Sequence, residues 1–314
     1  MAVGDLITAT RYNALQTRVE NILGNGTGTE GYGQVSASNQ VAVGNEVTAS
    51  HVNQLKTDID RVNRHQTNQA AGTIASITIG DVIADETSDD PNGTLKGFVD
   101  YEQSMNTLET SPNRFRLAPL QSTATSDPDT LTFGPTQWNS QLNGYFRVVF
   151  TSADARRHFF NAGGTITFVS NLVSTATGGN VAKTNDWSTM LSNAGTVSFG
   201  YNYTSTSNTG TGSAIGNYQL TSSEQQVFRK TGSGVYSDNN YYIRAKEVNT
   251  TTIEFRVWMN EADTGSTSGA KGVVPIDEFV VGNLTTTMGV VRASGSYVDT
   301  PIPALNRQAN FTGS

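Results

Sequence analysis

The chain has 314 residues, a formal net charge of −7 and no cysteine. The lack of cysteine excludes disulfides, thiolate zinc sites and cysteine nucleophiles, and the scattered lysines form no basic stripe of the kind that nucleic-acid-binding proteins carry. No apolar run approaches the roughly 20 residues that span a bilayer. We therefore expect no nucleic-acid partner and no membrane insertion, and the amino terminus predicts no signal peptide.

The amino-terminal region contains a repeated motif. Residues 2–13 (AVGDLITATRYN) match residues 42–53 (AVGNEVTASHVN) at an offset of forty. In each copy a threonine, Thr8 or Thr48, stands where it can cap a helix. The pattern predicts one helix in each copy, and the Gly-rich stretch 24–34 between them reads as a flexible loop, because no strand precedes it as a phosphate-binding loop requires.

Both predicted helices carry apolar residues at coiled-coil a/d spacing. Two heptads are too few for a stable isolated coiled coil, so these faces need partners from the same chain or from other chains. We predict an assembly interface that forms a homo-oligomer, a trimer as first choice, or contacts other proteins. Its residues are Tyr12, Leu15, Val19, Ile22, Val52, Leu55, Ile59 and Val62.

The next region holds a predicted strand, Thr73–Ile79, and a third helix with a/d residues from Phe98 to Leu108. Pro112 ends that helix. The acidic stretch Asp81–Asp90 lacks the EF-hand spacing, which favours a solvated turn over a calcium loop. The polar stretch 121–129 is the candidate domain boundary.

The stretch 144–171 predicts a strand, a helix and a second strand. Alternation over 145–150 indicates the first strand. Ser152 can cap the helix, Ala155, His158, Phe159 and Ala162 give it one buried face, and Gly163 suits its left-handed end. The same helix–Gly–strand order recurs around Trp187, Met190, Leu191 and Ala194, with Gly195 and then TVSF. Short amphipathic helices of this kind should pack on the sheet that the following strand joins, with Phe159, Phe168, Trp187, Leu191 and Phe199 buried.

After Tyr203 the chain reads as short strands separated by polar loops, which indicates a sandwich or similar compact sheet. The predicted fold class is α+β: a helical repeat region followed by a β-rich, sandwich-like domain with two short helices. The predicted strands are 217–220, 225–230, 241–246, 252–259, 279–281, 287–292 and 296–298. The predicted domains are 1–70 (anchor repeats 2–23 and 42–63), 71–136 (linker region), 137–303 (β-rich module) and 304–314 (a loosely ordered tail).

Motifs of catalysis do not stand out. His51, His65 and His158 form neither HExxH nor a facial triad, so each reads as a packed or solvated histidine. There is no GxSxG elbow and no SxxK. A catalytic pair of carboxylates that cleaves sugar is an alternative, but no spacing favours any two of the candidates. These are Asp238, Glu247, Glu254, Glu261 and Asp263. We predict no catalytic residue, no cofactor and no metal ligand, and hence no enzyme.

Aromatic residues gather in the carboxy-terminal half. In a polar, Asn- and Thr-rich surround such rings can stack on sugar, although packing between neighbouring strands is the favoured interpretation. The candidate glycan contacts are Tyr236, Tyr241, Tyr242 and Trp258.

An ordered series of short motifs resembles a module of virion structural proteins of tailed bacteriophages, above all marine cyanophages. It runs from Gln137 to Pro303 as FFNAGG–TITF, NDWSTMLSNAGT, YQLT, KTGSGVYSDNNYYI and ASGSYVDTPIP. The amino-terminal segments GDLITATRYNALQTRV and GNEVTASHVNQL are similar to those of cyanophage structural proteins. The resemblance implies a structural virion protein that is assembled in the host cytoplasm alongside other virion proteins.

Within that resemblance the first expectation is a tail fibre, baseplate or neck appendage, with the amino-terminal part for assembly and the carboxy-terminal part as an exposed or connecting body. The alternatives are a capsid-surface decoration protein and a tail protein that binds or degrades a host surface glycan.

Overall fold

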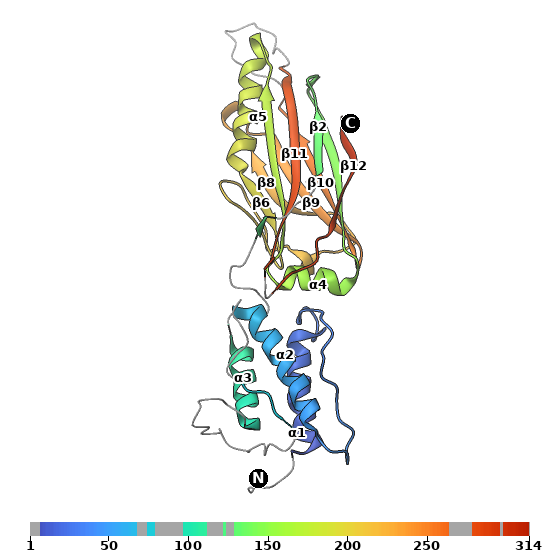
Figure 1. Cartoon of the computed structure of the whole chain (residues 1–314). Coiled ribbons are helices and arrows are strands. Elements are labelled where there is room, and N and C mark those ends of the chain that lie inside the picture. Colours follow the sequence, from blue (N-terminus) through green and yellow to red (C-terminus); the bar gives the residue numbers. More distant parts are fainter. Residues whose placement is uncertain are drawn as a thin grey trace. The chain divides into compact units, whose positions relative to one another are not determined.

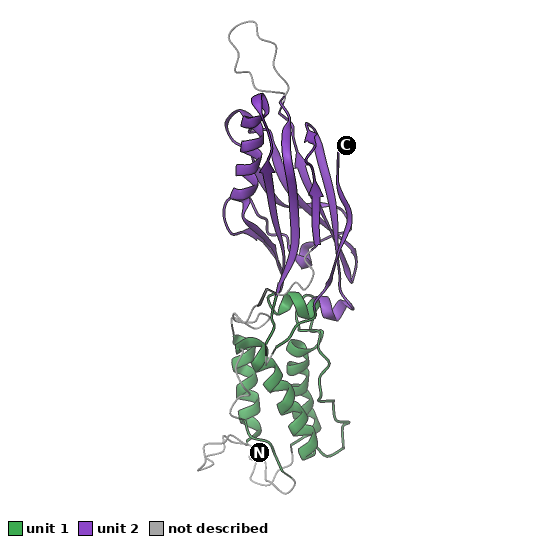
Figure 2. Cartoon of the chain, turned by 45° about the horizontal axis from the view of Figure 1, so that its top comes forward, with its two compact units in different colours: residues 1–122, 157–163, 292–301 green, residues 123–156, 164–291, 302–314 purple. Residues whose placement is uncertain are grey.

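The computed structural model describes residues 7–67, 74–78, 97–111, 122–123, 129–263, 278–295 and 298–313. It contains helices and two antiparallel sheets, which confirms the predicted α+β class. The chain divides into two compact units, coloured separately in Figure 2. Unit 1 comprises residues 1–122, 157–163 and 292–301, and unit 2 comprises 123–156, 164–291 and 302–314. The predicted acidic turn at 81–90 lies outside the described residues.

Three helices of the described residues lie wholly within unit 1 (Figure 1), and both copies of the repeat begin one of them as predicted. The Thr8 hydroxyl accepts a hydrogen bond from Arg11 N (3.3 Å), and the Thr48 hydroxyl accepts one from His51 N (3.4 Å). Thr8 and Thr48 therefore each satisfy a backbone donor that a helix start leaves unpaired. The helices are α1 (Ala9–Leu23), α2 (Ala49–Thr67) and α3 (Phe98–Thr110).

The apolar faces of these three helices form one core within a single chain. All eight residues of the predicted assembly interface belong to it, each at most 2% exposed. The α3 residues Phe98, Tyr101 and Met105 are fully buried in the same core. The prediction that these side chains form an intermolecular interface is therefore corrected, because the third helix supplies the missing partner from within the chain.

An asparagine at the end of each repeat motif fixes a following segment of chain. Asn13 donates from Nδ2 to Val41 O (2.8 Å) and accepts at Oδ1 from Val41 N (2.8 Å). Asn53 does the same with Ile77 O (2.7 Å) and Ile77 N (2.8 Å). Each amide thus replaces the pairing that a strand neighbour would give to one residue. We call these two arrangements the asparagine clamps.

The Asn53 clamp explains why the strand predicted at 73–79 does not form. Of its residues the structure describes 74–78, where only Ile74 makes a β-bridge and the rest have no regular structure. The segment instead buries Ile74 and Ile77 in the helical core, and the Tyr101 hydroxyl donates to Ala75 O (2.9 Å). Asn53 of α2 thus pairs with the backbone of Ile77, and Tyr101 of α3 pairs with that of Ala75.

Unit 2 is a sandwich of two sheets (Figure 1), as the strand-rich sequence predicted. The seven-stranded sheet contains β1 (Ser122–Thr123), β2 (Asp129–Phe133), β3 (Gln137–Trp138), β5 (Thr165–Ser174), β6 (Thr196–Phe199), β7 (Thr204–Thr206) and β11 (Val280–Arg292). The five-stranded sheet has the order β12-β4-β10-β9-β8, with β4 (Gln141–Val149), β8 (Gln225–Thr231), β9 (Asn240–Asn249), β10 (Thr252–Asn260) and β12 (Ala304–Gly313).

Aromatic rings join the inner faces of the two sheets. Phe168 of the larger sheet lies 4.9 Å from Phe255 of the smaller one, centroid to centroid, and Phe199 lies 5.1 Å from the same ring. Phe146 on β4 is 6.1 Å from Phe168. Ring pairs at these distances add to the stability that burial already provides.

Both predicted helix–Gly–strand units are present. The first helix is α4 (Ala153–Asn161), where the Ser152 hydroxyl accepts from Ala155 N (3.0 Å). The second is α5 (Val181–Ala194), which packs against β5. Gly163 (φ 87°) and Gly195 (φ 62°) both have the positive φ that favours glycine after the helices. The five residues predicted to be buried, Phe159, Phe168, Trp187, Leu191 and Phe199, are at most 1% exposed.

Several predicted boundaries differ from the structure. The unit boundary falls at 122/123, inside the polar stretch 121–129 rather than at 136/137, because β2 pairs with β11 in the sandwich. Residues 217–219 form a 3₁₀ turn, and the strands predicted at 279–281 and 287–292 are one strand, β11. The predicted tail 304–314 pairs with β4 as β12, because the edge of β4 offers it unpaired backbone groups.

Candidate functional site

The four predicted glycan contacts divide into two pairs. Tyr236 and Tyr241 are buried, 7% and 1% exposed. The Tyr236 hydroxyl donates to Glu278 (2.7 Å) and the Tyr241 hydroxyl pairs with Ser170 (3.0 Å). Burial raises the pKa of both hydroxyls. These two residues are core side chains, so the prediction that they contact glycan is corrected.

Tyr242 and Trp258 lie together on the outer face of the five-stranded sheet. They are directly opposite in the register of β9 and β10, and their rings stack at 4.9 Å with 28° between planes. Both are partly exposed. They point outward because their strand neighbours Tyr241, Ile243, Val257 and Met259 occupy the core, and successive side chains of a strand alternate between faces.

Three arginines surround this aromatic pair. The guanidinium carbons of Arg244 and Arg256 lie 4.6 Å and 4.8 Å from the Trp258 ring centroid. Those of Arg229 and Arg244 lie 5.7 Å and 5.8 Å from the Tyr242 ring. At these distances the rings attract and hold the cations. We call Arg229, Tyr242, Arg244, Arg256 and Trp258 the arginine–aromatic face.

Short polar side chains fix the arginines further. Asn143 Oδ1 accepts from Arg256 Nε (2.8 Å), and Asn240 Oδ1 accepts from Arg229 Nε (2.8 Å). Glu224 lies 3.3 Å from Arg256 and 3.9 Å from Arg244. The guanidinium groups are thus held in place before any ligand arrives, which reduces the entropy that binding would cost.

The row beside the arginine–aromatic face is a charged ladder across β4, β10 and β9. Glu254 accepts from Arg147 Nε (2.8 Å) and pairs with Lys246 Nζ (2.8 Å). Burial raises the pKa of Glu254, but the hydrogen bonds from Lys246 and Arg147 outweigh it and leave that pKa below its ordinary value. Glu254 is therefore an ionised partner of two cations and does not suit the role of a general acid. With Arg147 and Lys246, the outer face carries five basic side chains against Glu224 and Glu254.

Most carboxylates considered for sugar cleavage have structural partners. Glu247 pairs with Arg156 (2.9 Å). Glu261 and Asp263 converge on the buried Lys183, at 3.2 Å and 3.1 Å, with side chains only 3% and 7% exposed. The structure therefore brings one pair of candidate carboxylates together, but buries it where a polysaccharide does not reach. Asp238 is exposed in the turn before β9.

Sequence reasoning missed a buried histidine pair in unit 1. The Nε2 atoms of His65 and His158 are 3.0 Å apart, although 93 residues separate them along the chain. His65 Nδ1 lies 2.8 Å from Arg61 O and must donate to that carbonyl, so His65 Nε2 is an acceptor. The Gln34 amide is oriented by Arg61, which donates to its oxygen (2.7 Å), and its nitrogen contacts both rings.

The histidine pair is held neutral. Burial lowers the pKa of His65 to about 4, with the Arg61 charge adding to the effect. Burial also lowers the pKa of His158 to about 3, assisted by the His65 and Arg61 charges. Nothing in the spacing of the sequence brings these rings together; the only signal was the position of His158 on an apolar helix face. His51 lies elsewhere, where its Nδ1 accepts from Thr48 N (3.1 Å) at the start of α2.

The described ranges contain neither a metal-binding cluster nor a membrane-spanning helix. Among these residues no group of three or more His, Asp or Glu side chains could hold a metal ion, and no helix has both the length and the apolar character needed to cross a bilayer. No protein-family model, curated protein or solved structure matches the chain.

Proposed function

We propose that this protein is a structural component of a tailed-phage particle, placed in a tail fibre, baseplate or neck appendage. The observation that supports the proposal most is that the two stretches similar to virion proteins belong to separate compact units. The repeated motif builds the helices of unit 1, and most of the module from Gln137 onward folds in unit 2. Unit 1 is then the assembly part, and unit 2 is the exposed or connecting body.

The test is to fractionate purified particles of a phage that encodes this chain into heads and tails and to identify the proteins by mass spectrometry. We expect this chain in the tail fraction at a fixed ratio to other tail proteins. Its presence in heads alone would favour the alternative of a capsid-surface decoration protein. Its absence from washed particles of both kinds would overturn a virion role.

A second candidate function is recognition of an acidic glycan on the host surface, and the arginine–aromatic face favours it. Its guanidinium groups are matched in geometry to carboxylate or sulfate groups. They form a basic patch on a chain of net charge −7. The faces of Trp258 are covered by Tyr242 and the arginines, so charge rather than sugar stacking would provide most of the attraction.

Adjacent residues on β8 provide a matched pair of variants for this binding. Arg229 is opposite Tyr242 on the outer face, whereas the next residue, Lys230, is opposite the buried Tyr241. Arg229→Gln and Lys230→Gln each remove one positive charge from neighbouring positions. On an array of uronate-containing and sulfated glycans we expect Arg229→Gln to weaken binding several-fold, Lys230→Gln to leave it nearly unchanged, and added salt to weaken the wild type.

Equal losses in the two variants would indicate nonspecific charge attraction and would contradict a site on this face. In a separate assay the purified protein is incubated with host capsule, lipopolysaccharide and peptidoglycan, and released oligosaccharide is measured. We expect no release. Release that disappears when two neighbouring carboxylates are neutralised would place the chain among glycan-degrading tail proteins instead.

A further inference from the structure

Lys183 lies in the first turn of α5 with its side chain completely buried in unit 2. Four oxygen atoms surround its Nζ. They are Glu278 O at 2.8 Å, Asp263 Oδ2 at 3.1 Å, Glu261 Oε1 at 3.2 Å and the side-chain amide oxygen of Asn139 at 3.4 Å. A buried amine is therefore in contact with two carboxyl groups and one carboxamide.

The cluster carries more negative than positive groups. Glu261 and Asp263 face the single amine, and the nearby Glu278 carboxylate accepts from the Tyr236 hydroxyl. Burial raises the pKa of Glu261 above its ordinary value, and this effect exceeds the opposing attraction of Lys183. Glu261 is thus a carboxyl group that can both take up and return a proton, which is what a proton shuttle requires.

We propose that Lys183 and Asn139 become joined by an intramolecular isopeptide bond, with Glu261 as the proton-transfer group. The Lys183 ammonium first gives a proton to Glu261, and the neutral Nζ then attacks Cγ of Asn139. As the new Nζ–Cγ bond forms, the Cγ–Nδ2 bond breaks, and Nδ2 leaves as ammonia after receiving a proton through Glu261. One amide replaces another, so the step needs no oxidant, reductant or energy source.

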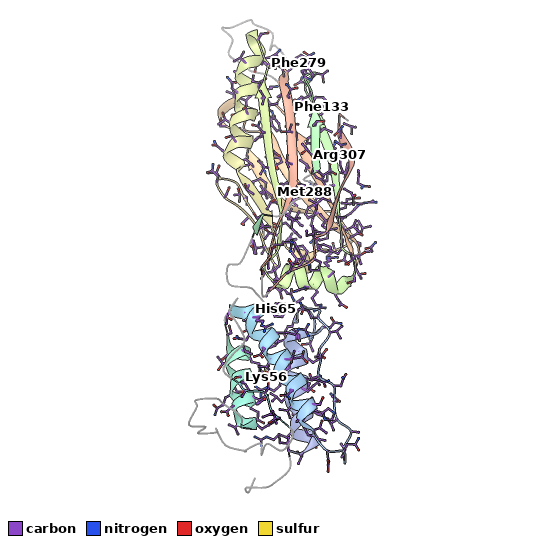
Figure 3. The ribbon with its side chains drawn as sticks, viewed as in Figure 1. Lys56, His65, Phe133, Phe279, Met288 and Arg307 are labelled. Atoms are coloured by element: carbon purple, nitrogen blue, oxygen red, sulfur yellow. The ribbon has the colours of Figure 1, made fainter. Side chains whose placement is uncertain are left out.

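The surroundings hold the reacting groups in place. The start of α5 is tied to β11, because Phe279 N donates to Asn180 Oδ1 (2.8 Å) and Val281 N donates to Thr184 Oγ1 (3.0 Å). Phe279 is labelled in Figure 3 near the start of β11. Glu278 is the residue before Phe279, and its backbone oxygen accepts the hydrogen bond that orients Lys183 Nζ. Fixed geometry of this kind replaces a bimolecular encounter by a step within one molecule.

Two buried tryptophans lie close in sequence to the two residues to be joined. Trp138, the residue before Asn139, and Trp187, one turn after Lys183, contact each other edge to face at 4.8 Å. They are 4% and 0% exposed. The bond would link the turn between β3 and β4 to α5 and close a long loop, which restricts the unfolded chain as a disulfide does. In a chain without cysteine, such a link would persist in both reducing and oxidising surroundings.

The test is the intact mass of the full-length protein under denaturing conditions. We expect a mass lower than that of the sequence by one ammonia. In a tryptic digest Lys183 should resist cleavage, and its peptide should appear joined to the peptide that contains Asn139. An unchanged mass in fully folded protein would overturn the proposal and leave an ionic cluster.

Three variants that retain Lys183 identify the acceptor and the shuttle. Asn139→Ala should have the full sequence mass, and Glu261→Gln should remain unlinked or link much more slowly. Asn139→Asp should link with loss of water and reach the same final mass as the linked wild type. A link from Lys183 to Asp263, or ammonia lost only from another peptide, would overturn the assignment of Asn139 as the acceptor.

Discussion

At the scale of single residues, the histidine pair shows how burial changes a side chain's chemistry. His65 and His158 are 4% and 7% exposed, and the charged group in contact with them through Gln34 is the cation Arg61. Arg61 pairs with the Asp58 carboxylate (3.1 Å), which also accepts hydrogen bonds from Ala37 N and Ser38 N. Among the described residues named here, a proton added to either ring would therefore find no carboxylate without other partners.

The pair predicts that unit 1 loses stability in acid. The folded-state pKa values of about 4 and about 3 lie below the ordinary value of 6.5. As pH falls below 6.5 the unfolded chain therefore binds protons first, and unfolding becomes more favourable until the folded pKa values are reached. Each histidine contributes up to about 1.4 kcal/mol per pH unit in that window. Urea unfolding followed at pH 7, 6, 5 and 4 measures the slope.

The double variant His65→Gln, His158→Gln is the control for that slope. It keeps hydrogen-bonding capacity but removes the two titrating groups, so its free energy of unfolding should fall less steeply between pH 6.5 and 4. Carboxylates that titrate in the same range contribute equally to both proteins. Parallel curves for the wild type and the double variant would contradict the predicted role of the histidine pair.

At the scale of elements, the asparagine clamps give the sequence repeat a physical meaning. The two copies share more than a helix, because the last residue of each motif pairs both backbone groups of a residue far along the chain. Val41 and Ile77, the clamped residues, are 5% and 3% exposed. If a clamp were removed, water would therefore not readily replace its two hydrogen bonds. The repeated unit is thus a helix together with the segment that it clamps.

We expect Asn53→Ala to lower the free energy of unfolding of unit 1 by roughly 1–3 kcal/mol, because it leaves one donor and one acceptor of a buried residue unpaired. Asn13→Ala should cost a similar amount. Asn45→Ala is the matched control: Asn45 is exposed, and its replacement should change stability by less than about 0.5 kcal/mol. Equal values for Asn53→Ala and Asn45→Ala, from thermal or urea unfolding, would count against the clamp.

At the scale of the whole molecule, the apolar faces of α1, α2 and α3 pack against one another inside one chain. Ion pairs accompany the packing: Arg11 binds Glu102 and Arg18 binds Glu109, both at 2.8 Å, so that α1 and α3 pair twice at a spacing of seven residues. A homo-oligomer remains a prediction, but the apolar faces of the three helices no longer require one. Other surfaces of the chain would have to form its contacts.

The variant Leu55→Ala distinguishes a core within one chain from an interface between chains. Leu55 is fully buried in the unit 1 core. We expect the variant to lose about 2–5 kcal/mol of stability and to sediment as the wild type does at equal concentration while it stays folded. Dissociation of an oligomer at unchanged stability of the protomer would restore the intermolecular interpretation. Val43→Ala is the control: Val43 is exposed, so its truncation should change the free energy of unfolding only slightly.

The sequence by itself determined the elements that local patterns specify. Alternation predicted β4, the series of short segments between polar loops predicted β8, β9 and β10, and a/d spacing predicted α1, α2 and α3. Ser152, Gly163 and Gly195 predicted the ends of α4 and α5. These features depend on side-chain period and on the backbone freedom of single residues, which can be judged without a partner.

Only the tertiary structure decided what those elements pack against and which side chains meet. It turned the predicted interface into a core, made a strand of residues 304–313, and placed Tyr241 inward and Tyr242 outward. It also brought His65 to His158 and Lys183 to Asn139, Glu261 and Asp263. Contacts of this kind join residues far apart in the chain, and no local period records them, because they follow from sheet register and from how complete faces are covered.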